Sequence, residues 1–366
     1  MRPRLYLSIF MPVIVYVYSF GQTGYKFSLE LPYSYSWAHH PYMNNLTGRT
    51  FTGLQVNLHF DRTRQVKDWI VAHNYPETGI LFIYQNLQHP DLGKIIGSVY
   101  YFTFFLNKRS KKLNFLLQFG EGIAYNTNPY DKIENPKNIV FGSHLLYAFY
   151  FTAKLRYTFT GSPWEWETGF SMYHYSNGSY KTPNSGLNLP GFNIALLYNF
   201  NKTNNKIPQT NRNISFQKKR YREIYIRGTL SEMEVPGLGV KPGIIFGFKH
   251  VWHPAFKHQY YAGAELMLNY AYKSYLAYQH IAFNEYEKIP DFKRIAITGG
   301  YMFNLDPTNF ILGTGIYLYN PSRKHLWYVR AGMSYRIASK WRLSATVKTH
   351  YFTAEEVDIG LHYIIN

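Results

Sequence analysis

Large apolar residues alternate with polar or small ones along most of the chain, from about residue 24 to its end. In the segment 113–125 (LNFLLQFGEGIAY), one parity carries Leu, Phe, Ile and Tyr, whereas the other is mostly Asn, Gln, Gly and Ala. A period of two residues predicts a β-strand with two different faces. A large apolar face opposite a small, polar one is typical of a membrane barrel, with lipid outside and a polar lumen inside.

The alternation predicts sixteen strands, separated by turns rich in Asn, Gly, Pro and Lys. The first eight are expected near 24–37, 50–60, 78–87, 94–106, 112–125, 143–159, 164–176 and 191–200. The second eight are expected near 222–231, 241–251, 257–271, 292–303, 308–319, 325–337, 341–352 and 355–365.

The two groups of strands are separated by residues 201–221, a polar and basic stretch without alternation that reads as a linker. We therefore predict an all-β fold made of two tandem eight-stranded transmembrane antiparallel β-barrels, 23–200 and 222–366. A single sixteen-stranded barrel is the alternative. The length of the connection argues against it, because turns on the periplasmic side of such barrels are short.

The N-terminal segment has the layout of a secretory signal peptide. Arg2 and Arg4 precede an apolar run, and small or polar residues follow it up to Gln22. We expect residues 1–22 to direct export and to be removed near Gly21. Export and strand periodicity together predict the outer membrane of a Gram-negative bacterium.

Composition agrees with this class of protein. The 366 residues are 19% aromatic and include no cysteine, so neither a disulfide nor a cysteine nucleophile can form. The net charge of +18 is large for the length. For an exported barrel, nucleic acid is a poor partner, and the charge favours an anionic membrane surface such as phosphorylated lipopolysaccharide.

The two halves resemble each other, which indicates an internal duplication. Residues 156–177 have a counterpart in 334–353, where a Trp-led strand again rises to a His-Tyr pair at His350. At the position of Ser176 the second half has Phe352. We therefore expect the second unit to be non-catalytic.

Candidate chemistry concentrates in the hairpin SMYHYSNGSYKTPNSGLNLPGF, residues 171–192. Parity in the strand 164–176 places Trp, Phe and Met on one face and Glu165 and Glu167 on the other. The glutamates belong in the lumen, so His174 and Ser176 project outward toward lipid. If the mature chain starts in the periplasm, the pair lies at the outer end of the seventh strand, beside the outer leaflet.

A histidine and a serine two residues apart on one strand face are about 6.6 to 6.8 Å apart at Cα, a span that a leaning imidazole can bridge. Such a contact is the minimum for acyl transfer, because serine needs a general base. Asn188, across the hairpin, is the nearest side chain able to orient the imidazole. Glu121, on the outward face of the fifth strand, is a more distant acid.

The residues HYSNGSYKTPNSG, followed by Leu187 and Asn188, resemble the active-site hairpin of the lipid A 3-O-deacylase (PagL-type) family of outer-membrane esterases. The resemblance covers residues 23–200 and is strongest over 170–200. It implies an eight-stranded barrel whose last hairpin carries an outward-facing His–Ser pair and removes an ester-linked acyl chain from lipid A. The family pattern has Glu where this chain has Asn188.

The resemblance also implies roles for residues of the hairpin. Ser176 would be the nucleophile and His174 the general base, while Asn188 would stand in the place of the acidic third member. The oxyanion would be met by Asn184 and by amides around Asn177, Gly178 and Ser179.

A non-catalytic barrel, either structural or a narrow channel, is the alternative function. No cofactor or metal is expected: His250, His253 and His258 straddle a turn without a carboxylate set. His39 and His40 are interpreted as a hydrated pair in a surface loop.

Overall fold

The computed structural model describes residues 24–63, 65, 67–200, 216–283, 288–321, 325–351 and 353–365. The proposed signal peptide, most of the proposed linker and Phe352 lie outside these residues.

The first half of the chain forms one closed antiparallel barrel in which each strand pairs with its sequence neighbour and β8 pairs with β1. Its strands are β1 (Gly24–Tyr35), β2 (Thr50–Asp61), β3 (Glu77–Asn86), β4 (Lys94–Phe105), β5 (Leu113–Asn126), β6 (Leu145–Thr158), β7 (Trp164–Ser176) and β8 (Leu187–Asn199). A 3₁₀ turn, η2 (Pro41–Met43), follows β1, and a short helix, α1 (Asp68–Ala72), lies between β2 and β3.

The second half forms another closed antiparallel barrel, in which β16 pairs with β9. Its strands are β9 (Lys219–Ser231), β10 (Lys241–Ala255), β11 (His258–Asn269), β12 (Lys293–Leu305), β13 (Thr308–Tyr319), β14 (Trp327–Ala338), β15 (Trp341–His350) and β16 (Thr353–Ile365). Two tandem eight-stranded barrels are thus confirmed. The sixteen-stranded alternative is wrong, because each set of strands closes on itself.

Two local differences from the sequence prediction have clear causes. The eighth strand begins at Leu187, not near residue 191, because Leu187 and Asn188 continue the ladder opposite Tyr175 and His174. The eleventh strand stops at Asn269, where helix α2 (Tyr270–Phe283) begins. The Asn269 Oδ1 accepts a hydrogen bond from the backbone N–H of Tyr272 at 3.0 Å, the usual role of an N-cap side chain.

No helix in the described residues is both long and apolar enough to cross a membrane.

The strand faces are sorted as the alternation predicts. Along β5 and β7, the polar and small parity is largely buried, whereas large apolar residues of the other parity are mostly exposed. Exposed apolar side chains continue around both barrels, for example at Leu31, Ile194 and Ile226. An apolar outer wall around a polar interior is the arrangement that a lipid bilayer requires.

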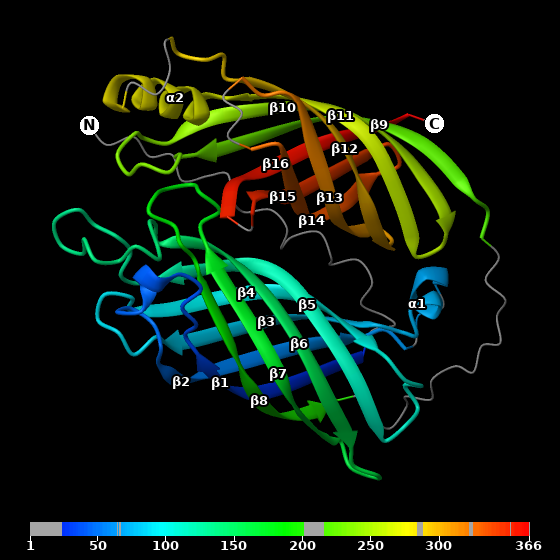
Figure 1. Ribbon diagram of the computed structural model, residues 1–366. Helices are drawn as coiled ribbons and strands as arrows, with labels where there is room; N and C mark the ends of the chain where they lie inside the picture. The colour runs from blue at the N-terminus through cyan, green and yellow to red at the C-terminus, as the bar shows by residue number, and fades with distance from the viewer. Residues whose placement is uncertain are drawn as a thin grey trace, which may run out of the picture.

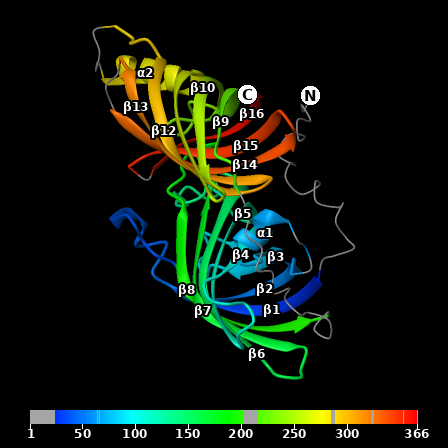
Figure 2. The same cartoon turned by 90° about the vertical axis from the view of Figure 1, so that its right-hand side faces the viewer.

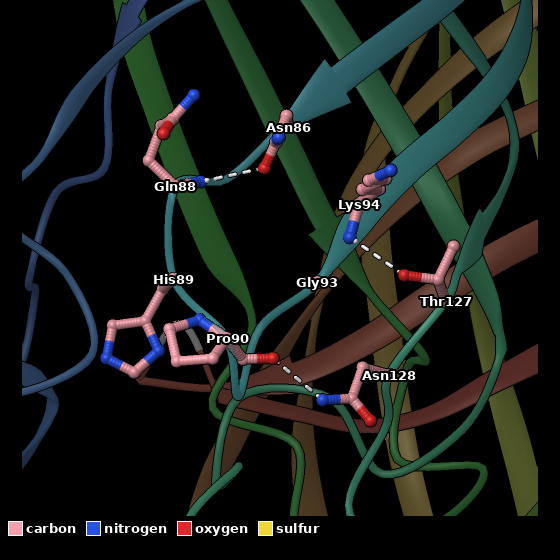
Figure 3. Close-up of a pocket in the computed structure, with 8 residues that line it drawn as sticks. All are labelled: Asn86, Gln88, His89, Pro90, Gly93, Lys94, Thr127 and Asn128. Atoms are coloured by element: carbon pink, nitrogen blue, oxygen red, sulfur yellow. Dashed lines mark hydrogen bonds between the residues drawn. The ribbon is translucent and has the colours of Figure 1, made fainter.

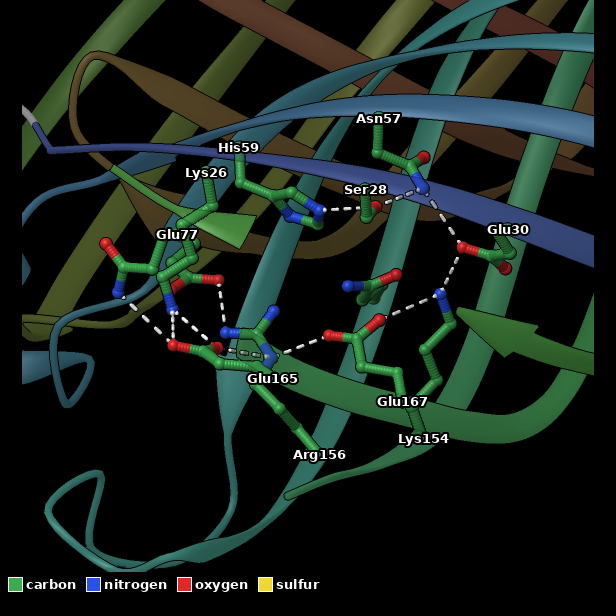
Figure 4. Close-up of polar contacts among 12 residues, drawn as sticks. Lys26, Ser28, Glu30, Asn57, His59, Glu77, Lys154, Arg156, Glu165 and Glu167 are labelled. Atoms are coloured by element: carbon green, nitrogen blue, oxygen red, sulfur yellow. Dashed lines mark hydrogen bonds and ion pairs between the residues drawn. The ribbon is translucent and has the colours of Figure 1, made fainter. Parts of the chain in front are cut away.

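Ion pairs bridge the lumen of the first barrel (Figure 4). Lys154 of β6 reaches Glu30 of β1 at 2.7 Å, and Arg156 reaches Glu77 of β3 at 2.8 Å. Glu165 and Glu167 of β7 join this network through Lys26 and Arg156, as their parity predicts. The interior of an eight-stranded barrel is narrow enough for side chains to fill it, and here charged pairs do so.

The two barrels lie side by side (Figures 1 and 2). Phe310 of β13 packs edge-on against Phe119 of β5, with ring centroids 4.2 Å apart. The β7–β8 loop contacts Glu232, which follows β9, and His73 beside α1 contacts Phe303 at the end of β12. Loops that follow odd-numbered strands therefore meet at one end of the pair, so the barrels run in the same direction. We call this the loop end, and the other the turn end.

Candidate functional site

The hairpin β7–β8 positions the candidate residues through its register. Tyr173 and Tyr175 point into the lumen, where their hydroxyls donate to Gln55 and Gln85 at 2.7 and 2.9 Å. Successive side chains of a strand point to opposite faces, so His174 and Ser176 lie on the outer wall. Both are near the loop end of β7.

His174 and Asn188 form a directly opposed cross-strand pair on this wall. The His174 Nδ1 lies 2.7 Å from the Asn188 Oδ1. An amide oxygen only accepts, so this contact assigns the imidazole proton to Nδ1 and leaves Nε2 unprotonated. The Asn188 amide therefore selects the tautomer in which Nε2 can act as a base.

Ser176 lies two residues beyond His174 on the same face and is 7% exposed. Gly186 packs against both residues: a Cβ at this position would lie 3.1 Å from the His174 Cε1 and 3.3 Å from the Ser176 Cβ. Its φ of +72° also favours glycine. No hydrogen bond joins Ser176 to His174 among the described contacts. In substrate-free sites such bonds are often long and tighten only when substrate binds.

The loop after Ser176 brings together the candidate oxyanion donors. The Asn184 Oδ1 accepts from the Asn177 backbone N–H at 2.8 Å, which leaves the Asn184 Nδ2 available as a donor. Gly178 and Ser179 adopt left-handed conformations, with φ of 61° and 64°. The backbone N–H of Asn177 and its side-chain amide both donate within the loop, since the side chain donates to the Lys181 carbonyl at 2.6 Å.

His39 belongs to this site, although sequence reasoning interpreted it as a hydrated surface residue. Its Nδ1 lies 3.4 Å from the Asn188 Nδ2, and its Nε2 lies 3.1 Å from the Ser185 carbonyl oxygen. Burial lowers the pKa of His39, so the ring is neutral at pH 7. The β1–β2 loop thus supports Asn188 from behind. An isolated bridge between Trp37 and Asn188 holds it there, and no local sequence pattern reveals such a contact.

Glu121 does not contact His174. It lies on the outer face of β5, and Phe149 of β6 stands between the two residues in the register. Its side chain is hydrogen-bonded to Tyr147, the residue directly opposite Ser176 on β6. The contacts therefore place Asn188 beside the imidazole and leave Glu121 in a separate polar pair.

His350 does not occupy the outward-facing position that its apparent correspondence with His174 suggests. His350 points into the lumen of the second barrel, with its Nδ1 3.0 Å from the Glu355 carboxylate. His174 points outward. The distance from the strand's tryptophan explains the difference: His350 is nine residues after Trp341, whereas His174 is ten after Trp164 and eight after Trp166. An odd spacing reverses the face, so the second half has no equivalent of the outward histidine at this position.

A serine–histidine–glutamate chain exists inside the second barrel. The Ser344 Oγ lies 2.9 Å from the His362 Nε2, and the His362 Nδ1 lies 3.0 Å from the Glu223 carboxylate. All three side chains are buried in the lumen, and Lys249 pairs with Glu223 at 2.9 Å. We interpret these three hydrogen-bonded side chains as part of the ion network that fills the barrel, because they face away from the membrane.

A polar cavity of about 420 Å³ opens between loops at the loop end of the first barrel, and Figure 3 shows the residues that line it. It is lined by Asn86, Gln88, His89, Pro90, Gly93, Lys94, Thr127 and Asn128. None of these residues belongs to the predicted site.

Two family models match the chain. Residues 54–196 match "Lipid A 3-O-deacylase (PagL)", and residues 235–366 match "Acyloxyacyl hydrolase, C-terminal domain". The curated proteins contain no significant sequence match to the chain.

Similar solved structures include CdiB from Acinetobacter baumannii, at 8% identity over 93% of this chain and 60% of that protein, with a TM-score of 0.18. The P. putida toluene transporter TodX matches at 9% identity over 94% of this chain and 90% of that protein, with a TM-score of 0.17. Similarity at this level carries no functional argument.

Proposed function

Because the first barrel of this chain belongs to the lipid A 3-O-deacylase (PagL) family, we propose that the protein is an outer-membrane serine esterase that removes an ester-linked acyl chain from lipid A. The observation that carries the proposal is the His174–Asn188 hydrogen bond on the lipid-facing wall. Polar side chains that face lipid are costly in free energy, so those that are present usually mark a functional site.

The proposed reaction begins with attack of the Ser176 Oγ on the ester carbonyl carbon. The His174 Nε2 takes the hydroxyl proton, and Asn188 holds the imidazole and stabilises its orientation. The tetrahedral oxyanion accepts hydrogen bonds from the Asn184 Nδ2 and from the amides of Gly178 and Ser179. As the C–O bond breaks, His174 returns the proton to the leaving oxygen, which becomes a free hydroxyl group of lipid A. Water then hydrolyses the acyl-enzyme with the same base.

Asn188 differs from a carboxylate in one chemical respect. It fixes the tautomer and direction of the imidazole but adds no negative charge to balance the imidazolium that forms during attack. The Cys-His-Asn proteases use an asparagine in this role. We therefore expect the enzyme to turn over more slowly than one with a carboxylate at this position.

The outer wall of β7 and β8 supports acyl-chain binding below the polar pair. Phe170 and Phe192 are directly opposed, with ring centroids 6.1 Å apart, and Phe192 is 67% exposed. Ile194 continues the same face toward the turn end. An acyl chain lying along this wall would keep its ester near Ser176 at the outer leaflet while remaining in hydrocarbon.

The filled lumens argue against the channel alternative. Charged side chains from opposite strands meet across the first barrel, as in the Lys154–Glu30 pair. The second barrel is bridged similarly by the Arg330–Glu265 pair at 3.2 Å. A structural, non-catalytic barrel remains the outcome to be tested.

Mass spectra of lipid A from Gram-negative cells expressing the protein test the proposal. The wild type should yield lipid A lighter by one acyl chain, and Ser176→Ala should leave lipid A unmodified at equal expression in the outer membrane. Ser171→Ala is the matched control. It changes a buried, lumen-facing serine on the same strand and leaves Ser176 and Asn188 unchanged, so it should retain activity. Identical lipid A from wild type and Ser176→Ala would overturn the esterase function.

A further inference from the structure

We propose that the second barrel acts as a clamp on the catalytic hairpin, with Glu232 as the positioning residue that holds the oxyanion loop, residues 177–183. This inference rests on the proposed esterase function of that loop. It assigns a role to the second unit, which the chemistry at Ser176 does not itself explain.

Glu232 connects the two barrels through its carboxylate. Its Oε2 accepts hydrogen bonds from the Thr182 backbone N–H and from the Thr182 hydroxyl, both at 2.9 Å. Its Oε1 accepts from the backbone N–H groups of Gly237 and Gly239 at 3.0 and 2.8 Å. One side chain therefore binds the β9–β10 loop to the catalytic hairpin.

The carboxylate is well suited to a permanent contact. Glu232 is 3% exposed, and its four donors come from N–H and O–H groups, with no cation paired to it among the described residues. A buried charge is costly unless hydrogen bonds satisfy it. Separation of the two loops would break the hydrogen bonds to Thr182, and the Glu232 carboxylate would then be unsatisfied or exposed to water. Both carboxylate oxygens accept hydrogen bonds here, whereas the side-chain amide of a glutamine could accept at its single oxygen only.

Three further contacts from the second barrel reach the same loop, directly beside the proposed oxyanion donors. The Glu232 backbone N–H donates to the Ser179 carbonyl at 2.9 Å, and the Ser179 hydroxyl donates to the Ala354 carbonyl. At Gly178, an added Cβ would lie 2.1 Å from the Val357 Cγ2, so β16 packs directly on the glycine. The second barrel therefore contacts the loop at Gly178, Ser179 and Thr182.

The first barrel holds the later part of the hairpin loop, and its Gly142 also packs against the Lys181 and Pro183 carbonyl oxygens. The backbone N–H groups of Ser185 and Gly186 donate to the carbonyls of Ile139 and Val140 at 3.2 and 3.1 Å. These contacts reach the residues after Asn184. The backbone at Gly178 and Ser179 is contacted by the second barrel in addition to the hydrogen bonds within the loop, and oxyanion donors must be fixed before the charge develops to be effective.

The test uses the full-length protein and a double-mutant cycle between the barrels. Glu232→Ala should lower kcat for lipid A deacylation about tenfold with little change in KM, and Thr182→Val should lower it about threefold. The double variant should be no slower than Glu232→Ala, because both changes remove one shared interaction. Thr182→Ser, which keeps the hydroxyl, should retain wild-type kcat.

A second readout is independent of activity. Trypsin cleaves after lysine, and Lys181 is exposed and directly precedes Thr182, whose peptide N–H donates to Glu232. We therefore expect trypsin to cut the folded protein slowly at this bond. Glu232→Ala should speed this cleavage about tenfold. Asp306→Asn, an exposed carboxylate of the second barrel at the turn end, should change neither cleavage nor kcat.

The outcomes separate the two proposals. Faster cleavage in Glu232→Ala, with no deacylation by the wild type, would refute the esterase and support the clamp as a structural contact of the loop. Deacylation by the wild type, with unchanged cleavage and unchanged kcat in Glu232→Ala, would overturn the clamp. Multiplicative losses of kcat in the double variant would also overturn it, because Thr182 and Glu232 would then act separately.

Discussion

At the scale of residues, Asn188 shows how a cross-strand position can complete the proposed site. It lies opposite His174 in the ladder and bonds the imidazole at 2.7 Å. The pairing fixes the tautomer through geometry alone, without a negative charge. The neighbouring His39 adds a second layer, since it contacts both Asn188 and the Ser185 carbonyl.

Replacing Asn188 tests this role. Asn188→Ala should lower kcat about tenfold with little change in KM, because a hydrogen bond worth about 0.5–1.5 kcal/mol orients the base in the transition state. Asn188→Glu should give a kcat equal to or above that of the wild type, because a carboxylate also stabilises the imidazolium. Steady-state deacylation rates in detergent provide the measurement. Equal kcat in the wild type and Asn188→Ala would show that Asn188 does not orient the base.

The titration of His39 gives a prediction with a definite sign. Burial lowers the pKa of His39 from 6.5, so the ring binds a proton less readily in the folded protein than in the unfolded chain. The contact is therefore complete above pH 6.5 and weakens as the pH falls through the lower folded value. NMR of histidine-labelled protein, with His39→Asn to assign the resonance, should give a midpoint below 6.5. A midpoint above 6.5 would contradict a half-buried, neutral ring.

At the scale of elements, each strand performs two tasks through its two faces. The inner face of β6 supplies Lys154 and Arg156 to the lumen, while its outer face includes exposed Leu155. The same division on β7 places Glu165 and Glu167 inside and His174 outside. A site on the outer wall is therefore compatible with a lumen that is filled by ion pairs.

Removing a central cation of this lumen should destabilise the first barrel. Arg156→Met leaves Glu77 and Glu167 without that partner and should lower the free energy of unfolding by about 3–5 kcal/mol. Urea unfolding monitored by tryptophan fluorescence would measure the loss. Arg336→Met is the matched control, because its pair with Asp306 is 41% and 44% exposed and should contribute less than about 1 kcal/mol. Equal losses would refute the structural role of the lumen network.

The outer face of the β7–β8 hairpin should contribute to substrate binding. Phe192→Ala removes an exposed aromatic contact below the polar pair and should lower kcat/KM about fivefold, consistent with about 1 kcal/mol of lost apolar burial. Phe82→Ala, a 58% exposed residue on the outer face of β3, should leave kcat/KM unchanged. The same loss in both variants would indicate a general effect on membrane packing.

At the scale of the whole molecule, the two barrels have different roles in the proposed reaction. The first carries the outward hairpin, and the second packs its β12–β13 wall against β4 and β5. Phe310 contacts both Phe102 and Phe119, with ring centroids 5.4 and 4.2 Å away. Contacts at both the loop end and the turn end fix the second barrel along the length of the first.

The absence of cysteine from the chain makes this arrangement directly testable. A Phe119→Cys, Phe310→Cys double variant should form an efficient crosslink with a short thiol reagent, because the two side chains are in contact. After cleavage at a protease site introduced into 201–215, the halves should remain joined on a denaturing gel. The control pair Phe192→Cys, Phe310→Cys should not crosslink, since Phe192 lies on β8. Equal crosslinking of both pairs would refute the packing described.

The sequence by itself determined the strands and their faces. A period of two residues specifies which side chains share a wall, so the sixteen strands, the lumen glutamates and the outward His174 and Ser176 could all be predicted. The spacing of the hairpin also brought Asn188 near the imidazole. These features are local: they depend on neighbours along one strand or across one turn.

Only the tertiary structure decided the contacts between segments far apart in the chain. Barrel closure at β8–β1 and β16–β9 excluded a single large barrel, and the β1–β2 loop brought His39 to Asn188. The contact of Glu232 with Thr182 joins residues fifty positions apart. Alternation carries no information about such pairs, because their distance depends on how two closed surfaces pack and not on the period of either strand.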